Sequence, residues 1–130
     1  MKRSPLRRKA KNSKTSLSTW KNKAWKVFSV WIRTRDPWCI TCSMRGTKTK
    51  AAHAGHYYHG ILDFDEVNIN GQCAGCNMYK SGDLAGYTEY IIQQHGVEGL
   101  LALQERRKLA RSGEIRSIED YKHIIERYSF

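Results

Sequence analysis

Apolar residues recur at three- and four-residue intervals in several stretches of the chain, and this spacing predicts amphipathic helices. The first stretch covers residues 20–35, where apolar residues at helical spacing form a stripe and Lys and Arg residues stand between them. Asp36-Pro37 ends it, because the residue before a proline avoids the helical conformation. Further helices are predicted at residues 84–95, at residues 97–111 and from Ser117 onward, where Ser117-Ile118-Glu119-Asp120 forms a cap-like acidic start. Gly96 and Ser112-Gly113 are the predicted breaks between them.

The centre of the chain lacks this helical spacing and consists of short segments bounded by turn residues. Residues 50–58 and 67–72 are predicted as strands, joined by a loop over residues 60–66. A short helix is predicted at residues 74–81, closed by Gly82 because glycine readily adopts the left-handed conformation. We therefore expect an α+β fold, in which a small strand–strand–helix core is flanked by α-helices.

All four cysteines of the chain lie in this central stretch, as two C-x-x-C pairs. The two-residue spacer lets a tight turn present both thiolates to one point, and two such pairs complete the tetrahedron that zinc prefers. We predict a structural zinc site formed by Cys39, Cys42, Cys73 and Cys76. Because such a site has no open coordination position, any catalytic group must come from the loop that it closes.

The alternatives to zinc are disulfides, free thiols or a redox-active cysteine pair. No apolar signal segment precedes the cysteines, so we expect a cytoplasmic location, where disulfides are rare. A redox-active pair explains the matched spacing less simply than one shared ion does.

The chain carries a formal net charge of +11, from 23 Lys and Arg against 12 Asp and Glu. Such an excess favours a polyanionic partner, because each neutralised phosphate releases condensed counterions, and DNA is the expected partner. No stretch reaches the ~20 apolar residues of a membrane-spanning helix, so no membrane partner is expected. The alternative of a basic helix on an anionic membrane surface leaves the cysteine loop unexplained.

The basic residues are concentrated at the start of the chain, where 12 of the 23 precede Asp36 and no acidic residue does. Residues 1–19 contain little that can be buried and are predicted as a disordered basic arm that orders on DNA. The alternative is a solvated tail that only aids solubility. The expected division is this arm, then residues 20–96 as a helix plus the zinc-bracketed core, then residues 97–130 as a C-terminal helical extension.

Polar residues inside the cysteine-closed loop follow a further pattern. His56 lies on the first predicted strand, and Asn68 stands five positions before Cys73. Asn77 directly follows Cys76 of the second cysteine pair, and Lys80 stands three positions after Asn77. This order resembles the HNH endonuclease superfamily, in the version where two C-x-x-C pairs bracket the active site. The resemblance implies a ββα-metal core.

A narrower resemblance runs from about Cys39 to Leu103, roughly half of the chain. The segments that carry it are Ala54-Gly55-His56-Tyr57, Phe64-Asp65-Glu66-Val67-Asn68, Gln72-Cys73, Cys76-Asn77, Ser81-Gly82 and Tyr87. Together they resemble the phage NinG/Rap family of recombination nucleases. That resemblance implies a phage-encoded, metal-dependent endonuclease that acts on branched recombination intermediates such as Holliday junctions and D-loops.

The resemblance to HNH enzymes also implies a role for each residue of the pattern. His56 would be the base that activates water, because a neutral imidazole is available near neutral pH. The side-chain oxygen of Asn77 would hold Mg²⁺ or Mn²⁺, which prefer oxygen ligands. Asn68 would fix the active loop and the orientation of the histidine, and Lys80 would contact the scissile backbone.

One position departs from the superfamily pattern. Most members place an acidic residue or a second histidine directly before the base, where it binds metal, and this chain has Gly55 there. Glycine has no side-chain ligand, so another residue must complete the site. His53 is the first candidate, and an imidazole ligand would favour Mn²⁺, Co²⁺ or Ni²⁺ over Mg²⁺ alone. The other candidates are Asp63, Asp65 and His59.

Two functions are the main alternatives on the sequence alone. One is a DNA endonuclease, and the other is a zinc-stapled nucleic-acid-binding module without hydrolysis. The cysteines and the basic arm fit both, whereas His56, Asn68 and Asn77 at their spacings favour the enzyme. A third, an RNA-directed nuclease or a homing-type enzyme with sequence preference, also stays open. A symmetric junction cut by two nicks would suit a homodimer, but no interface can be assigned from the sequence.

Overall fold

The computed structural model describes residues 5–111 and 116–130, with side chains from residue 16 onward. The chain forms two compact units, Met1–Phe28 with Ile115–Phe130, and Ser29–Glu114. Helices dominate the described residues, which contain a single two-stranded antiparallel sheet. The expected α+β class is confirmed at the level of a mixed fold with a small sheet.

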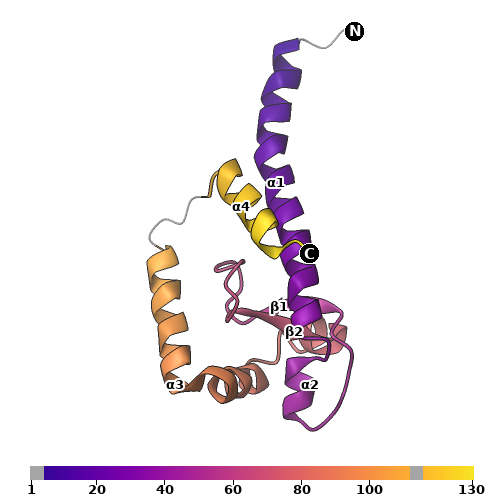
Figure 1. Cartoon of the computed structure of the whole chain (residues 1–130), viewed down its shortest axis with the longest axis vertical. Helices are drawn as coiled ribbons and strands as arrows, with labels where there is room; N and C mark the ends of the chain where they lie inside the picture. Colours follow the sequence, from indigo (N-terminus) through magenta and orange to yellow (C-terminus); the bar gives the residue numbers. More distant parts are fainter. Residues whose placement is uncertain (1–4, 112–115) are drawn as a thin grey trace. The chain divides into compact units, whose positions relative to one another are not determined.

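The first unit contains the amino-terminal part of α1, which spans Pro5–Arg35, and α4, which spans Ile118–Tyr128. Figure 1 draws α1 as a single long ribbon. Phe28 on α1 and Tyr128 on α4 pack edge to face, with ring centroids 4.7 Å apart. Both rings are buried, as is Ala24. The apolar stripes predicted on these two helices therefore meet.

Helix α4 starts where the sequence predicts, whereas α1 starts earlier than predicted. Ser117 and Asp120 form a reciprocal capping box at the start of α4, which confirms the predicted cap. Residues 1–19 are predicted as a disordered arm that orders on DNA, whereas α1 begins at Pro5; residues 1–4 lie outside the described part. Proline suits the first turn of a helix, and no glycine or second proline occurs until Asp36-Pro37.

The second unit contains the sheet, in which β1 (His53–His56) pairs antiparallel with β2 (Ile69–Gln72). Both strands are shorter than the predicted segments 50–58 and 67–72. The ladder ends early because the side chain of Asn68 hydrogen-bonds the backbone of the loop that follows β1. The loop predicted between the strands is confirmed.

Three helical segments accompany the sheet in this unit: α2 (Ile40–Met44), η1 (Gly75–Tyr79) and α3 (Leu84–Arg111). The short helix predicted at residues 74–81 corresponds to η1, a single π-helical turn. Gly96 interrupts α3 with non-helical backbone angles of φ 73° and ψ 174°, which confirms the predicted break. The break predicted at Ser112-Gly113 lies outside the described residues.

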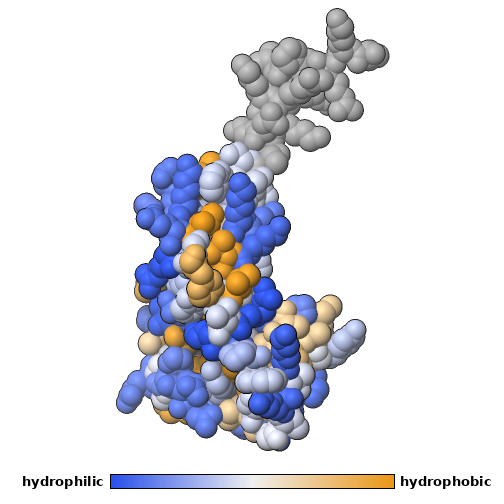
Figure 2. Space-filling model, turned by 45° about the vertical axis from the view of Figure 1, so that its right-hand side comes forward, coloured by the Kyte–Doolittle hydropathy of each residue, from blue (hydrophilic) through white to orange (hydrophobic). Residues whose placement is uncertain are grey.

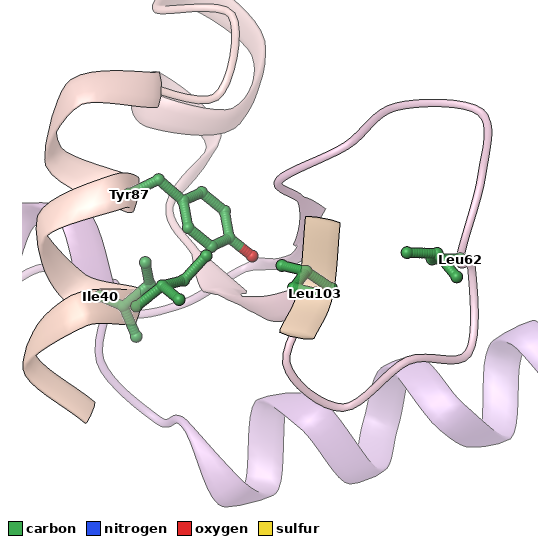
Figure 3. Close-up of a cluster of buried hydrophobic side chains, with 5 residues drawn as sticks. Ile40, Leu62, Tyr87 and Leu103 are labelled. Carbon is green, nitrogen blue, oxygen red and sulfur yellow. The ribbon is translucent and has the colours of Figure 1, made fainter. Parts of the chain in front are cut away.

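Five buried apolar side chains form the core of the second unit: Ile40, Leu62, Tyr87, Ile91 and Leu103. Figure 3 labels all of them except Ile91. Tyr87 is fully buried, and burial raises the pKa of its hydroxyl. This hydroxyl donates to the backbone oxygen of Gly55 at 2.7 Å and accepts from Asn70 Nδ2 at 3.0 Å. The core therefore holds β1 in place at Gly55.

Hydrophilic residues cover much of the face drawn in Figure 2, with smaller apolar groups among them. In the described parts of the chain, no helix combines the length and the apolar character that crossing a bilayer requires.

Replacing Tyr87 by Phe should lower the free energy of unfolding by about 1–3 kcal/mol, because two buried polar groups lose a partner. Urea denaturation of the zinc-loaded protein measures this change. Tyr79→Phe is the matched control, since Tyr79 is 84% exposed and its replacement should shift stability by less than about 0.5 kcal/mol. Equal stability of the two variants would contradict the anchoring role of Tyr87.

Candidate metal centre and neighbouring loop

The four cysteines of the predicted zinc site converge on one point. Their sulfur atoms all lie within 4.8 Å of one another, and Cys42 Sγ is 3.7 Å from the sulfurs of Cys73 and Cys76. A tetrahedron with Zn–S bonds of ~2.3 Å has sulfur–sulfur edges of about 3.8 Å, so the four cysteines are positioned to bind a metal ion such as zinc. All four are buried and none is in a disulfide.

The two cysteine pairs form matching turns. The backbone N–H of Cys42 donates to Cys39 Sγ at 3.4 Å, and the backbone N–H of Cys76 donates to Cys73 Sγ at the same distance. The first turn leads into α2 and the second into η1. The two-residue spacer produces this geometry, because it brings the backbone N–H of the second cysteine within hydrogen-bond distance of the sulfur of the first.

Arg45 lies beside the sulfur cluster. Its guanidinium donates to Cys76 Sγ at 3.1 Å and to Cys42 Sγ at 3.6 Å, and it forms an ion pair with Asp83. The hydrogen bond to Cys76 raises the pKa of Arg45, and the bond to Asp83 raises it further. Four thiolates on Zn²⁺ carry a net charge of −2, so a cation at this position stabilises the loaded site.

The thiols differ in their tendency to ionise. Burial opposes a thiolate at Cys42, but hydrogen bonds with Thr49 and the other cysteines outweigh burial and lower the pKa of Cys42 to about 6. Burial raises the pKa of the Cys73 thiol to about 12. A thiol must lose its proton to bind a metal, so an ion that binds here displaces the protons that remain on the sulfurs.

His56 ends β1 and is oriented by a carboxylate. Its Nε2 lies 3.1 Å from Asp63 Oδ1, and its ring stacks with that of His59, with centroids 6.1 Å apart. When Asp63 is ionised, Nε2 carries the hydrogen of this bond, so Nδ1 is the ring nitrogen with a lone pair to accept a proton. Asp63 was one of the candidate metal ligands, and the structure places it against the histidine.

Asn68 shapes the loop that follows His56. The side chain is fully buried, and its Oδ1 accepts from the Tyr58 N–H at 2.8 Å. Its Nδ2 lies 3.2 Å from each of the backbone oxygens of Tyr58, Ile61 and Leu62. These contacts agree with the loop-fixing role that the sequence resemblance implies for Asn68.

The Asn77 side chain lies against β1 at the position directly before His56. A Cβ atom built on Gly55 would lie 3.0 Å from Asn77 Oδ1 and 2.0 Å from Gln72 Oε1. Two carboxamide oxygens therefore approach the backbone of Gly55. Asn77 belongs to η1 and follows Cys76, so the second cysteine pair places this oxygen next to the strand that carries His56.

The carboxylate of Asp65 binds Arg106 on α3. Its carboxylate pairs with Arg106 at 2.7 and 3.2 Å and accepts the backbone N–H groups of Val67 and Asn68. Burial favours the neutral acid, but the bonds from Arg106 and the backbone outweigh burial and lower the pKa of Asp65. Asp65 thus joins the loop to α3, as a structural ion pair.

The remaining candidates lie at different places around the site. His53 stands opposite Gln72 in the ladder and shares its strand face with Gly55, so it stays a predicted ligand. His59 and Lys80 are exposed. Among the described residues, only the cysteines bring three or more His, Cys, Asp or Glu ligand atoms together.

Sequence reasoning assigned no role to Arg45 or Gln72. Arg45 is one of many basic residues, and nothing local distinguishes it before the second cysteine pair is folded against the first. Gln72 carries a weak signal, because strand alternation places it on the face that also holds Gly55.

Comparison with known protein families gives a match over the whole chain. The family model described as "Bacteriophage Lambda NinG protein" matches residues 1–130. The chain belongs to the NinG family. The resemblance noted from Cys39 to Leu103 thus extends to the basic amino-terminal segment and to the last helix.

Curated NinG proteins are similar over much of this chain. Protein ninG of Salmonella phage P22 is 37% identical over 99 residues, which cover 70% of this chain and 47% of that protein. Protein ninG of Escherichia phage lambda is 35% identical over 119 residues, covering 85% of this chain and 54% of that protein. The chain spans about half the length of the curated relatives it matches. No solved structure matches the chain significantly.

We expect this NinG chain to bind one zinc ion and to hold it with help from Arg45. Arg45→Met should weaken zinc binding about 10- to 100-fold, because the negative sulfur cluster loses its neighbouring cation. Competition with a chromogenic chelator measures the affinity. Lys50→Met, at an exposed lysine, is the matched control and should leave the affinity unchanged. Wild-type affinity in Arg45→Met would contradict this role.

Proposed function

We propose that this NinG chain is a metal-dependent DNA endonuclease of the HNH type. The observation that carries the proposal is the approach of Asn77 Oδ1 to the residue before His56, while Asp63 holds the histidine itself. An oriented imidazole that acts as base and an oxygen ligand for the ion are two groups that hydrolysis of a phosphodiester with one divalent ion requires. The order β1, loop, β2, η1 supports a ββα-metal interpretation of the core.

His56 is the proposed general base. Its bond to Asp63 fixes the tautomer, so Nδ1 takes the proton of the attacking water. The carboxylate then stabilises the imidazolium that forms, because it faces the protonated Nε2. Asn68 holds the loop after His56, and Tyr87 holds the backbone before it. Both are positioning residues.

Asn77 is the proposed ligand of the divalent ion, Mg²⁺ or Mn²⁺. Its neutral amide oxygen suits a hard cation, and its position in η1 is set by the adjacent Cys76. The bound ion would offset negative charge on the non-bridging and leaving oxygens of the phosphodiester. His53 is the proposed imidazole ligand, since it shares the face of β1 that Gly55 occupies.

Branched DNA is the proposed substrate. The net charge of +11 favours a phosphate backbone, and Lys80 lies exposed three positions after Asn77. Lysines at positions 21, 23 and 26 are exposed on α1 and supply further positive charge. The preference for junctions and D-loops follows from the resemblance to NinG/Rap nucleases, and a homodimer would deliver the paired nicks.

A zinc-stapled DNA-binding module without hydrolysis is the second candidate. The observation that favours it is the absence of any second convergent group of His, Cys, Asp and Glu ligand atoms in the part of the chain that the structure describes. The same net positive charge and cysteine cluster would serve such a module.

A cleavage assay with a synthetic four-way junction and a linear duplex, each with Mg²⁺ or Mn²⁺, separates the two candidates. His56→Ala and Asn77→Ala should each lower the cleavage rate at least about 100-fold, because one removes the base and the other the ligand. His95→Ala is the matched control, since His95 is exposed on α3. Junction binding without cleavage under either metal would support the binding module instead.

Replacing Asp63 by Ala should lower the cleavage rate about 10- to 100-fold, because the imidazole of His56 loses the group that fixes its tautomer. Single-turnover cleavage with saturating enzyme measures this rate. Glu89→Ala, at an exposed acidic residue of α3, should cleave like the wild type. Unchanged zinc content and unfolding temperature in Asp63→Ala show that the loss is local, and a wild-type rate would refute the orienting role.

A further inference from the structure

Position 55 has no room for the metal ligand that HNH enzymes place before their base. A Cβ atom on Gly55 would lie 2.0 Å from Gln72 Oε1 and 2.9 Å from Gln72 Cδ. Contacts this short do not occur between real atoms, so any side chain at position 55 requires Gln72 to move. The space that a ligand at position 55 would use is therefore filled by the carboxamide of Gln72.

The Gln72 carboxamide is held in one orientation. Its Nε2 donates to the backbone oxygen of Gly82 at 2.8 Å and to Thr41 Oγ1 at 3.2 Å. Exchanging the nitrogen and the oxygen would set two acceptors, Oε1 and the Gly82 oxygen, against each other. These bonds aim Oε1 at Gly55.

This oxygen has no hydrogen-bond donor among the described residues, although Gln72 is fully buried. A buried amide oxygen without a partner is costly and uncommon, and a bound ion or water is the usual explanation. Asn77 Oδ1 lies 3.0 Å from the same Cβ position at Gly55, so two oxygens with partial negative charge lie near one point. A cation between them relieves their repulsion.

We propose that Gln72 Oε1 is the second protein oxygen ligand of the divalent ion, in place of the side chain that Gly55 lacks. This inference rests on the proposed function, because it concerns the ion assigned to Asn77. Neutral carboxamide oxygens suit Mg²⁺ and Mn²⁺, and ligand bonds of ~2.0–2.2 Å let such an ion approach a buried oxygen more closely than a water molecule does. His53 faces Gln72 across the ladder and can complete the protein ligand set.

The competing interpretation makes Gln72 a spacer. In that case Oε1 only accepts a weak Cα–H···O contact from Gly55, and the residue fills space between the strands and η1. The two interpretations differ in one measurable respect: only a ligand changes the affinity for the divalent ion when its oxygen is removed.

A matched pair of variants isolates the oxygen. Gln72→Met and Gln72→Glu both lose the Nε2 donor to Gly82 and Thr41, but only Gln72→Met also loses the oxygen. Mn²⁺ affinity of the zinc-loaded protein is measured without DNA by electron paramagnetic resonance of the free ion. We expect Gln72→Met to bind Mn²⁺ about 10- to 100-fold more weakly than the wild type, and Gln72→Glu to bind at least as tightly as it.

Wild-type Mn²⁺ affinity in Gln72→Met overturns the proposal, and so does an equal loss in both variants. Zinc content and unfolding temperature are recorded for each variant. Should Gln72→Met not fold, the wild-type protein still provides a test by NMR. Mn²⁺ should broaden the side-chain amide signals of Gln72 and Asn77 at lower concentration than that of exposed Gln104, with Mg²⁺ as the diamagnetic control.

Failure of this inference is distinguishable from failure of the proposed function. If the wild type cleaves DNA with Mn²⁺ and Gln72→Met retains Mn²⁺ affinity, the nuclease stands and Gln72 is a spacer. If the wild type neither binds Mn²⁺ nor cleaves DNA, both proposals fail.

Discussion

The convergence of four cysteine sulfurs is the constraint on which the second unit depends. Cys42 Sγ meets sulfurs that are 31 and 34 residues away along the chain, so the cluster closes everything between α2 and η1 into one loop. Two strands of four residues each cannot hold such a loop alone, because a short two-stranded sheet is marginally stable in water. A structural zinc ion contributes its binding energy directly to folding. Arg45 extends this closure to Asp83, at the start of α3.

Within that loop, hydrogen bonds of buried amide side chains hold segments together, a role that apolar packing has in larger domains. The buried polar residues of the second unit are Thr41, Asn68, Asn70 and Gln72. Asn68 joins separate backbone segments, and Asn70 joins the Val67 backbone oxygen to the Tyr87 hydroxyl; each such hydrogen bond adds roughly 0.5–1.5 kcal/mol net. Burying amides is favourable only when their polar atoms are satisfied, so an unsatisfied Gln72 Oε1 is informative. It lies where the proposed ion would bind.

Local chemistry explains what could be predicted from the sequence. The cysteine spacing, the break at Gly96 and the cap at Ser117 each depend on a few neighbouring residues, and all three are confirmed. Helix α1 begins at Pro5, well before the predicted start at residue 20, because residues 6–35 contain no helix breaker. The partnerships of Asp63 and Arg45 join residues distant in sequence, and only the folded loop creates them.

Gly55 lacks a side chain, and the packing around it requires that absence. Its carbonyl is fixed from the core by Tyr87, while its Cα side is approached by the carboxamides of Gln72 and Asn77. A side chain at position 55 would come from β1, whereas the carboxamide of Gln72 reaches this place from β2. Since a Cβ atom on residue 55 would exclude Gln72, the glycine is what admits the carboxamide that we propose as a metal ligand.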